Sequence, residues 1–262
     1  MKLPKYVGNV LIGATAVVFA GGSYFLPDHD KNGPVLTAAV ELVAPKAKPA
    51  SDLAVMTSSA VEALSASVTR LSHPEALEDA FRSYFAFKSS HPNDVKKPFL
   101  YFVDYGLPST TPRGYVFDME SLRIVDGPFM VAAGRGSAAD ARGVPTRFSN
   151  QSGSAATSLG LYLTSSTYGF SGKSAGQHYT SVGLRLLGVS EGFNDNAFAR
   201  GVVAHGAPYV TPNRAGRSEG CPAMEQARAK QLLPMLANGA MVFLFAPNQQ
   251  WLSTDRWVNQ QG

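Results

Sequence analysis

The sequence VAHGAPYVTPNRAGRSEGCPAM occupies residues 203–224 and carries a histidine and a cysteine in two short, glycine-containing segments. The apolar residues before His205 predict a strand that delivers this histidine to a turn. The second segment predicts a tight loop that ends at Cys221 and leads into a helix after Pro222. The two side chains are therefore candidates for one site.

Cys221 and His205 have the chemistry of a nucleophile and its base. A thiolate is the reactive form of cysteine, and both a nearby imidazole and a helix N-terminus favour it. Glycine at position 220 lets the backbone approach a substrate carbonyl, so the amides of Gly220 and Cys221 are candidate oxyanion donors. Residue types alone leave two other interpretations open, because a lone cysteine is often a small buried apolar residue and can also form an intermolecular link.

Composition limits the other classes of function. The 262 residues are 45% hydrophobic and 16% charged, which predicts one domain with extensions and a sizeable core. A net charge of +4 without clustered Lys and Arg argues against a nucleic-acid partner. One cysteine excludes an intramolecular disulfide and a cysteine-based zinc site, and no phosphate-binding glycine loop is present. We therefore expect no metal and no cofactor.

The N-terminus predicts export. Lys2 and Lys5 precede an apolar run over residues 7–26, as in a signal peptide or a single membrane anchor. We expect residues 1–26 to be this segment, either cleaved or retained in the inner membrane, and residues 27–50 to be a proline-containing linker. The expected location of the remainder is the periplasm.

The rest of the chain predicts an α+β, mostly β, fold with a helical N-terminal lead-in. Helical periodicity dominates residues 51–95, β-rich runs separated by turn residues dominate residues 96–250, and residues 251–262 are expected to be a C-terminal tail. The expected strands are 99–103, 114–117, 129–133, 159–163, 182–187, 202–204 and 241–245, with one helix at 226–237.

The His-Gly and Ser-x-Gly-Cys elements resemble those of the YkuD-like L,D-transpeptidases, and more closely the branch called the murein L,D-transpeptidase catalytic domain family. The resemblance extends over about residues 104–247. It includes Gly134-Arg135-Gly136-Ser137, Phe148-Ser149-Asn150, Leu184-Arg185-Leu186, the run from Glu191 to Ala197, and Arg200. It implies a β-sandwich-like L,D-transpeptidase catalytic fold.

The resemblance also implies a reaction. The Cys221 thiolate would attack the carbonyl of an L-centre in a peptidoglycan stem peptide and form a thioester. An amine of diaminopimelate would resolve the thioester, giving 3-3 or 1-3 cross-links without ATP. His205 would be the base, the Gly206 carbonyl would orient its ring, and Ser218, Gly220 and Cys221 would frame the oxyanion site.

The chain departs from the broad family near the cysteine. Glu219 stands where many members carry a second histidine, and Pro222-Ala223 replaces an apolar-Arg pair. Arg217 is then the nearest candidate for binding a substrate carboxylate. His178 and Tyr179 match the closer branch and are candidates for lining the donor groove, although a hydrogen-bonded loop histidine is an equal alternative.

Two further functions stay open at this stage. The same fold can support a peptidoglycan carboxypeptidase or endopeptidase, in which water replaces the amine, and a non-catalytic wall-binding module would use Cys221 only as a buried thiol. Peptidoglycan stem peptides are the expected partner in each case. Glu191, Asp195 and Arg200 are interpreted as a polar network that supports the His205 strand.

Overall fold

A computed structural model describes residues 50–260 of the chain. The predicted export segment 1–26 and linker residues 27–49 lie outside the described residues. The described part is an α+β body made mostly of sheet, with helices at its N-terminal end, so the predicted fold class is confirmed. Within residues 50–260, no helix is both long enough and apolar enough to cross a membrane.

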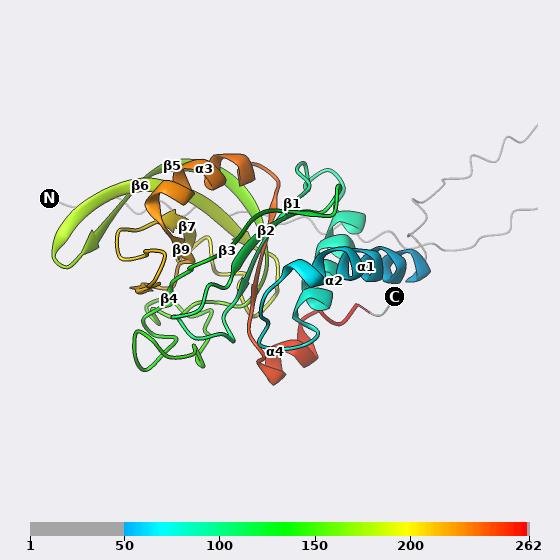
Figure 1. Cartoon of the computed structure of the whole chain (residues 1–262), viewed down its shortest axis with the longest axis horizontal. Helices are drawn as coiled ribbons and strands as arrows, with labels where there is room; N and C mark the ends of the chain where they lie inside the picture. Colours follow the sequence, from blue (N-terminus) through cyan, green and yellow to red (C-terminus); the bar gives the residue numbers. More distant parts are fainter. Residues whose placement is uncertain (1–49, 261–262) are drawn as a thin grey trace, which may run out of the picture. The chain divides into compact units, whose positions relative to one another are not determined.

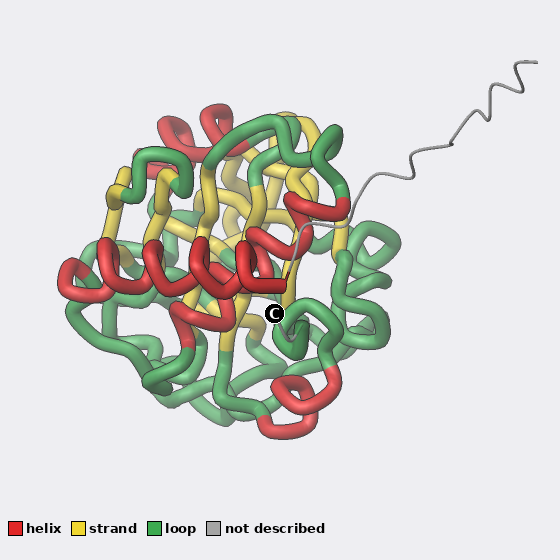
Figure 2. The backbone as a smooth tube through the Cα atoms, turned by 90° about the vertical axis from the view of Figure 1, so that its right-hand side faces the viewer, coloured by secondary structure: helices red, strands yellow, loops and turns green. Residues whose placement is uncertain are grey.

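The helical lead-in consists of α1 (Ala50–Leu64), a 3₁₀ turn (Ser65–Ser67) and α2 (Ala76–Ser90). Apolar residues at three- and four-residue spacing give α2 one buried face. This face contains Leu77, Ala80, Phe81, Tyr84 and Phe87. Both helices lie at one end of the described part of the chain (Figure 1), and they cross in front of the strands when that end faces the viewer (Figure 2).

Eight strands form the main sheet, in the order β3-β2-β1-β10-β5-β6-β7-β9. They are β1 (Phe99–Asp104), β2 (Gly114–Asp118), β3 (Arg123–Phe129), β5 (Gly160–Ser174), β6 (Gln177–Gly188), β7 (Val203–Gly206), β9 (Ala223–Met224) and β10 (Met241–Phe245). The pairs β1–β10 and β7–β9 are parallel, and the others are antiparallel. A second, parallel pair joins β4 (Ala133–Gly134) to β8 (Arg217–Ser218). The remaining helices are α3 (Gln226–Leu236) and α4 (Gln249–Thr254).

The C-terminal segment belongs to the core. The sequence predicted a tail at residues 251–262, but Trp251 and Trp257 are only 1% and 2% exposed. The Trp257 indole nitrogen donates to the Val189 carbonyl at 2.7 Å, and the Trp251 ring packs on β10 against Phe243. Two large aromatic side chains therefore attach this segment to the sheet.

A buried arginine supports the strands beneath the site. Arg113 is fully buried, and its guanidinium donates to the Val131 carbonyl at 2.9 and 3.0 Å. Its charge also lies over the Tyr105 ring, 4.9 Å from the centroid. The Tyr105 hydroxyl donates to the Ala132 carbonyl at 3.0 Å, and the Ala132 amide donates to the Ala223 carbonyl at 2.8 Å. These contacts connect the core to β9.

The β5–β6 hairpin is longer than the sequence predicted. Its strands cover residues 160–174 and 177–188 and meet at Ala175 and Gly176, which have φ of 50° and 80°. The predicted strands covered only the apolar ends, because the outer half is rich in Ser, Thr and Gly. Figure 1 shows the hairpin as a curved ribbon that extends beyond the sheet next to β7.

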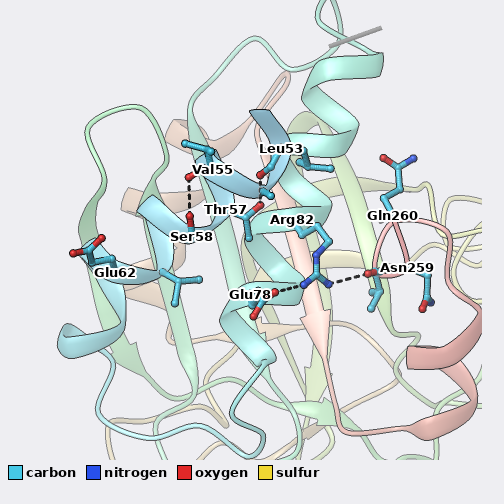
Figure 3. A pocket seen from close by; sticks show the side chains of 12 residues that line it. Leu53, Val55, Thr57, Ser58, Glu62, Glu78, Arg82, Asn259 and Gln260 are labelled. Carbon is cyan, nitrogen blue, oxygen red and sulfur yellow. Dashed lines mark hydrogen bonds and ion pairs between the residues drawn. The ribbon is translucent and has the colours of Figure 1, made fainter. Parts of the chain in front are cut away.

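A cavity of about 990 Å³ lies at the opposite, helical end. Its lining comes from α1, α2 and the C-terminal residues 258–260. Arg82 crosses it and contacts Glu78 and the Val258 carbonyl (Figure 3). None of these elements carries Cys221 or His205, so this cavity is separate from the predicted site.

Candidate active site

Strand β7 fixes the position of His205. The histidine lies opposite Gly183 of β6 on one side and Ala223 of β9 on the other. Its backbone amide donates to the Pro222 carbonyl at 3.3 Å. Because Pro222 follows Cys221 directly, backbone pairing brings the predicted base and the predicted nucleophile to the same edge of the sheet.

The His205 ring is buried and held in one orientation. Its residue is 3% exposed, and the Phe170 ring stacks on it at 4.1 Å and 18°. Burial lowers the pKa of His205 from 6.5 to about 4, although the hydrogen bond to Gly206 acts against this shift. Nδ1 lies 3.1 Å from the Gly206 carbonyl oxygen. Since a carbonyl oxygen only accepts, Nδ1 carries the proton and Nε2 keeps a free lone pair.

A hydrogen-bonded turn presents Cys221. The Ser218 hydroxyl donates to the Cys221 carbonyl at 2.6 Å and accepts from the Gly220 amide at 3.2 Å. Gly220 has φ of 125°, a conformation that side chains disfavour. The Gly220 amide is thus directed at Ser218 in this conformation, whereas the sequence placed it among the oxyanion donors. Ser218 and Gly220 both determine the shape of the turn.

The helix predicted at residues 226–237 is confirmed as α3, but it does not begin at the cysteine. Strand β9 follows Cys221, and α3 begins only at Gln226. Because the effect of a helix dipole falls off within the first turn, α3 is not the source of thiolate stabilisation that the sequence suggested. The pairing of β9 with β7 explains the difference, since residues 223–224 complete the sheet before the chain turns into the helix.

Opposing effects act on the Cys221 thiol, which is partly exposed. Burial is the largest and raises its pKa, and the charge of Glu219 acts in the same direction. A backbone hydrogen bond with Val203 and the charge of Arg200 lower it. The net pKa lies above the usual range, so the thiol and the imidazole are both neutral near pH 7.

Backbone segments approach the Cys221 turn closely from behind. A β-carbon added to Gly134 would lie 2.8 Å from Gly220 Cα and would also meet the Ala155 carbonyl. The Gly134 amide donates to the buried Thr157 hydroxyl at 2.9 Å. The glycine is therefore required by a close approach of three chain segments.

The two charged candidates beside the turn differ in their surroundings. Arg217 is exposed on β8. The Glu219 carboxylate is exposed, and both of its oxygens accept hydrogen bonds from Arg135 Nε, at 2.7 and 2.9 Å. The Arg135 amide also donates to the Ser218 carbonyl at 2.7 Å. Arg135 was not among the site residues predicted from the sequence, although the Gly134–Ser137 segment that contains it was part of the family resemblance.

The candidates His178 and Tyr179 lie on the outer part of the ribbon. Tyr179 contacts the rings of Tyr209 and Phe170, with centroids 6.4 and 6.1 Å away. His178 is exposed, pairs with Lys173 and lies on the other face, because neighbouring strand residues alternate. Tyr179 therefore shares the face that covers His205, and His178 does not.

The predicted polar network of Glu191, Asp195 and Arg200 does not form as expected. Asp195 accepts from the Asn150 side chain at 2.5 Å, and Glu191 is exposed. Arg200 instead binds carbonyl and hydroxyl oxygens of residues 149–158. Among residues 50–260, no three His, Cys, Asp or Glu side chains are grouped to hold a metal ion.

A family model described as the L,D-transpeptidase catalytic domain matches residues 69–245, more than half of the 262 residues. The chain belongs to this L,D-transpeptidase family. The match covers α2, every strand and all the site residues described above. The resemblance inferred from the two motifs is confirmed.

Solved L,D-transpeptidases are also similar to this family member. One from Mycobacterium smegmatis is 15% identical, with 57% of this chain and 59% of that chain covered and a TM-score of 0.34. A fragment from Xylanimonas cellulosilytica is 16% identical, with 57% and 61% covered and a TM-score of 0.34. One from Stackebrandtia nassauensis is 19% identical, with 65% and 66% covered and a TM-score of 0.36. The chain thus spans less than two thirds of each. No curated protein matches the chain.

Proposed function

We propose that this protein is a peptidoglycan L,D-transpeptidase in which Cys221 is the nucleophile and His205 is the base. The observation that carries this proposal is the state of His205. Its ring is buried and neutral, and the Gly206 carbonyl holds it through Nδ1. Its strand, β7, pairs with β9, which directly follows the Cys221 turn. Family membership supports the reaction class.

The reaction begins with a neutral pair. The Cys221 proton passes to His205 Nε2 as the sulfur attacks the carbonyl carbon of an L-centre in a stem peptide. The imidazolium then returns this proton to the leaving amine as the peptide bond breaks, which leaves a thioester on Cys221. An amine of diaminopimelate attacks the thioester and loses its proton through His205. The thiol is regenerated, and a 3-3 or 1-3 cross-link forms.

Proton transfer at the moment of attack fits the electrostatics better than a resting ion pair. Burial lowers the pKa of His205 to about 4 and raises that of Cys221 above its usual range. An ion pair at rest would require the reverse order of the two pKa values. His205 therefore acts as a base during attack, and the developing charge on sulfur needs other stabilising groups.

The remaining candidates are proposed to bind substrate. Arg217 is exposed beside the turn and can grip a stem carboxylate with two parallel hydrogen bonds. Tyr179, on the ribbon face that covers His205, can line the donor groove. His178 lies on the opposite face of the ribbon, so we do not propose that it lines the groove beside His205.

Muropeptide analysis tests the proposal directly. Purified protein is incubated with stem peptides attached to disaccharides, and the products are identified by mass spectrometry. We expect cross-linked dimers from wild type, none from Cys221→Ala and almost none from His205→Ala. His91→Ala, a matched histidine change at the end of α2, should leave the yield unchanged. The double variant should be no worse than Cys221→Ala, because the two residues act as a unit.

Other products would change the conclusion. Shortened stem peptides without dimers would assign the protein to carboxypeptidases or endopeptidases that use water as the acceptor. Dimers formed by a folded Cys221→Ala variant would exclude this mechanism. A covalent carbapenem adduct at Cys221, detected by intact mass, would independently identify the nucleophile.

The proposed substrate also requires an exported enzyme. The lysine-flanked apolar run at residues 7–26 supports export, and the linker at residues 27–50 would separate the catalytic domain from the membrane if the segment is retained. We therefore propose a periplasmic location.

A further inference from the structure

Arg200 makes an unusual set of contacts near the candidate active site. Nη1 donates to the Ser149 carbonyl at 2.7 Å and to the Ser158 hydroxyl at 2.6 Å. Nη2 donates to the Ala156 carbonyl at 2.9 Å and to the Ser154 hydroxyl at 3.2 Å. All four acceptors are uncharged, and none of the ion pairs found within residues 50–260 includes Arg200. No carboxylate of these residues is therefore within ion-pair distance of the guanidinium.

The same contacts hold the loop 149–158 behind the Cys221 turn. A β-carbon placed on Gly220 would lie 2.9 Å from the Ala156 carbonyl oxygen and 3.6 Å from Arg200 Nη2. The Cys221 sulfur lies 4.0 Å from the carbonyl oxygen of Gly201, the residue that follows Arg200. Arg200 therefore lies directly behind the turn that carries the thiol.

Few other charges can act on the sulfur. His205 is neutral, and the exposed Glu219 is paired with Arg135. The tyrosines that interact electrostatically with Cys221 have pKa values raised above 10 and stay neutral. These tyrosines are Tyr105, Tyr162, Tyr168, Tyr179 and Tyr209. Arg200 is the cation whose charge favours the thiolate.

We propose that Arg200 is a positioning residue for Cys221. Its guanidinium fixes loop 149–158 behind the Cys221 turn and places an unneutralised positive charge where the thiolate develops. In the proposed function, on which the catalytic meaning of this inference rests, the charge stabilises the sulfur while His205 takes its proton. An opposite charge within a few ångströms of a partly buried group shifts its pKa by about one unit or more.

The single cysteine of the chain allows a direct test that requires no turnover. Iodoacetamide alkylation of the full chain is followed by intact mass from pH 7 to 10.5, and the apparent pKa of the thiol is taken from the rate profile. Arg200→Gln removes the charge and keeps some hydrogen bonding, whereas Arg200→Lys keeps the charge. Arg147→Gln removes an exposed arginine that precedes the same loop and is the matched control.

We expect Arg200→Gln to raise the apparent thiol pKa by about one unit and to slow alkylation at pH 8 about tenfold. Arg200→Lys should recover part of this loss, and Arg147→Gln should shift the profile by less than about 0.3 unit. Glu219→Gln should move the profile in the opposite direction, because it removes a negative charge near the sulfur.

Three results would overturn the inference. The first is a folded Arg200→Gln variant whose profile matches wild type. The second is an equal loss in Arg200→Lys and Arg200→Gln, which would assign the effect to loop order rather than to charge. The third is unfolding of both variants, which would assign Arg200 to stability alone. If the alkylation profiles are as expected but wild type forms no cross-links, the proposed function is refuted. The role of Arg200 toward the thiol is then still supported.

Discussion

Replacement of Asp79 by asparagine is expected to stabilise the protein at neutral pH. Asp79 lies in the first turn of α2 and is 5% exposed, with Arg82 Nη1 at 3.1 Å from its carboxylate. Burial raises its pKa from 3.8 to about 6 and outweighs the lowering effect of Arg82. The folded protein therefore has to hold an unfavourable charge above this pH.

The sign and size of the effect follow from linkage. Because the pKa is higher in the folded state, that state binds the proton more tightly, and stability is lost as pH rises from 3.8 to about 6. A shift of about two units corresponds to about 3 kcal/mol. Asparagine resembles the protonated carboxyl, so Asp79→Asn should recover up to about 3 kcal/mol above pH 6 and almost nothing below pH 4.

Urea denaturation at several pH values measures this difference, with the fluorescence of the two tryptophans, Trp251 and Trp257, as the signal. Glu78→Gln is the matched control, since its side chain is 47% exposed and bonds the same Arg82. It should change the free energy of unfolding by less than about 1 kcal/mol. An Asp79→Asn variant that is less stable than wild type at pH 7.5, or whose difference does not depend on pH, would refute the reasoning.

Three more predictions concern packing and export. Gly134→Ala should lower the free energy of unfolding by about 1–3 kcal/mol and reduce cross-linking, because its β-carbon would meet the Cys221 turn. Gly169→Ala is the control: a β-carbon there has nothing within 4 Å, so melting temperature and product yield should not change. Trp257→Ala should lower stability by about 3–5 kcal/mol in a urea titration, since the buried indole loses its packing and its bond to Val189; a smaller loss than 1 kcal/mol would contradict the core assignment. A C-terminal reporter that is active only in the cytoplasm should be silent on the full chain, and a bright signal would exclude export.

The local structure around the candidate pair could be predicted because its signal is local. The apolar residues before His205 and the glycines around Cys221 indicate a strand and a turn whatever the rest of the chain does. The helix predicted at residues 226–237 is present as α3, but the strand 223–224 before it was missed, because so short a strand produces no periodicity of its own. Its formation depends on pairing with β7, which is a tertiary effect.

The neighbours of the pair could not be predicted from local pattern. Phe170 covers His205 from a polar stretch, where Tyr168 and Phe170 gave only a brief alternating signal. Arg200 was matched as part of a motif, but its partners on loop 149–158 are distant in the sequence. The buried Arg113 contradicts the usual exposure of charged residues and is explained only by the carbonyl groups that surround it.

The place of β10 in the sheet has a consequence for the order in which the chain folds. This strand is made after all the others, yet it lies between β1 and β5 at the middle of the sheet. A growing chain therefore presents two apolar strand edges without a partner until synthesis has nearly finished. Contacts so distant in sequence also form slowly. In the export proposed above, a newly made chain would still be open when it reached a membrane channel, and it would need protection from aggregation until then.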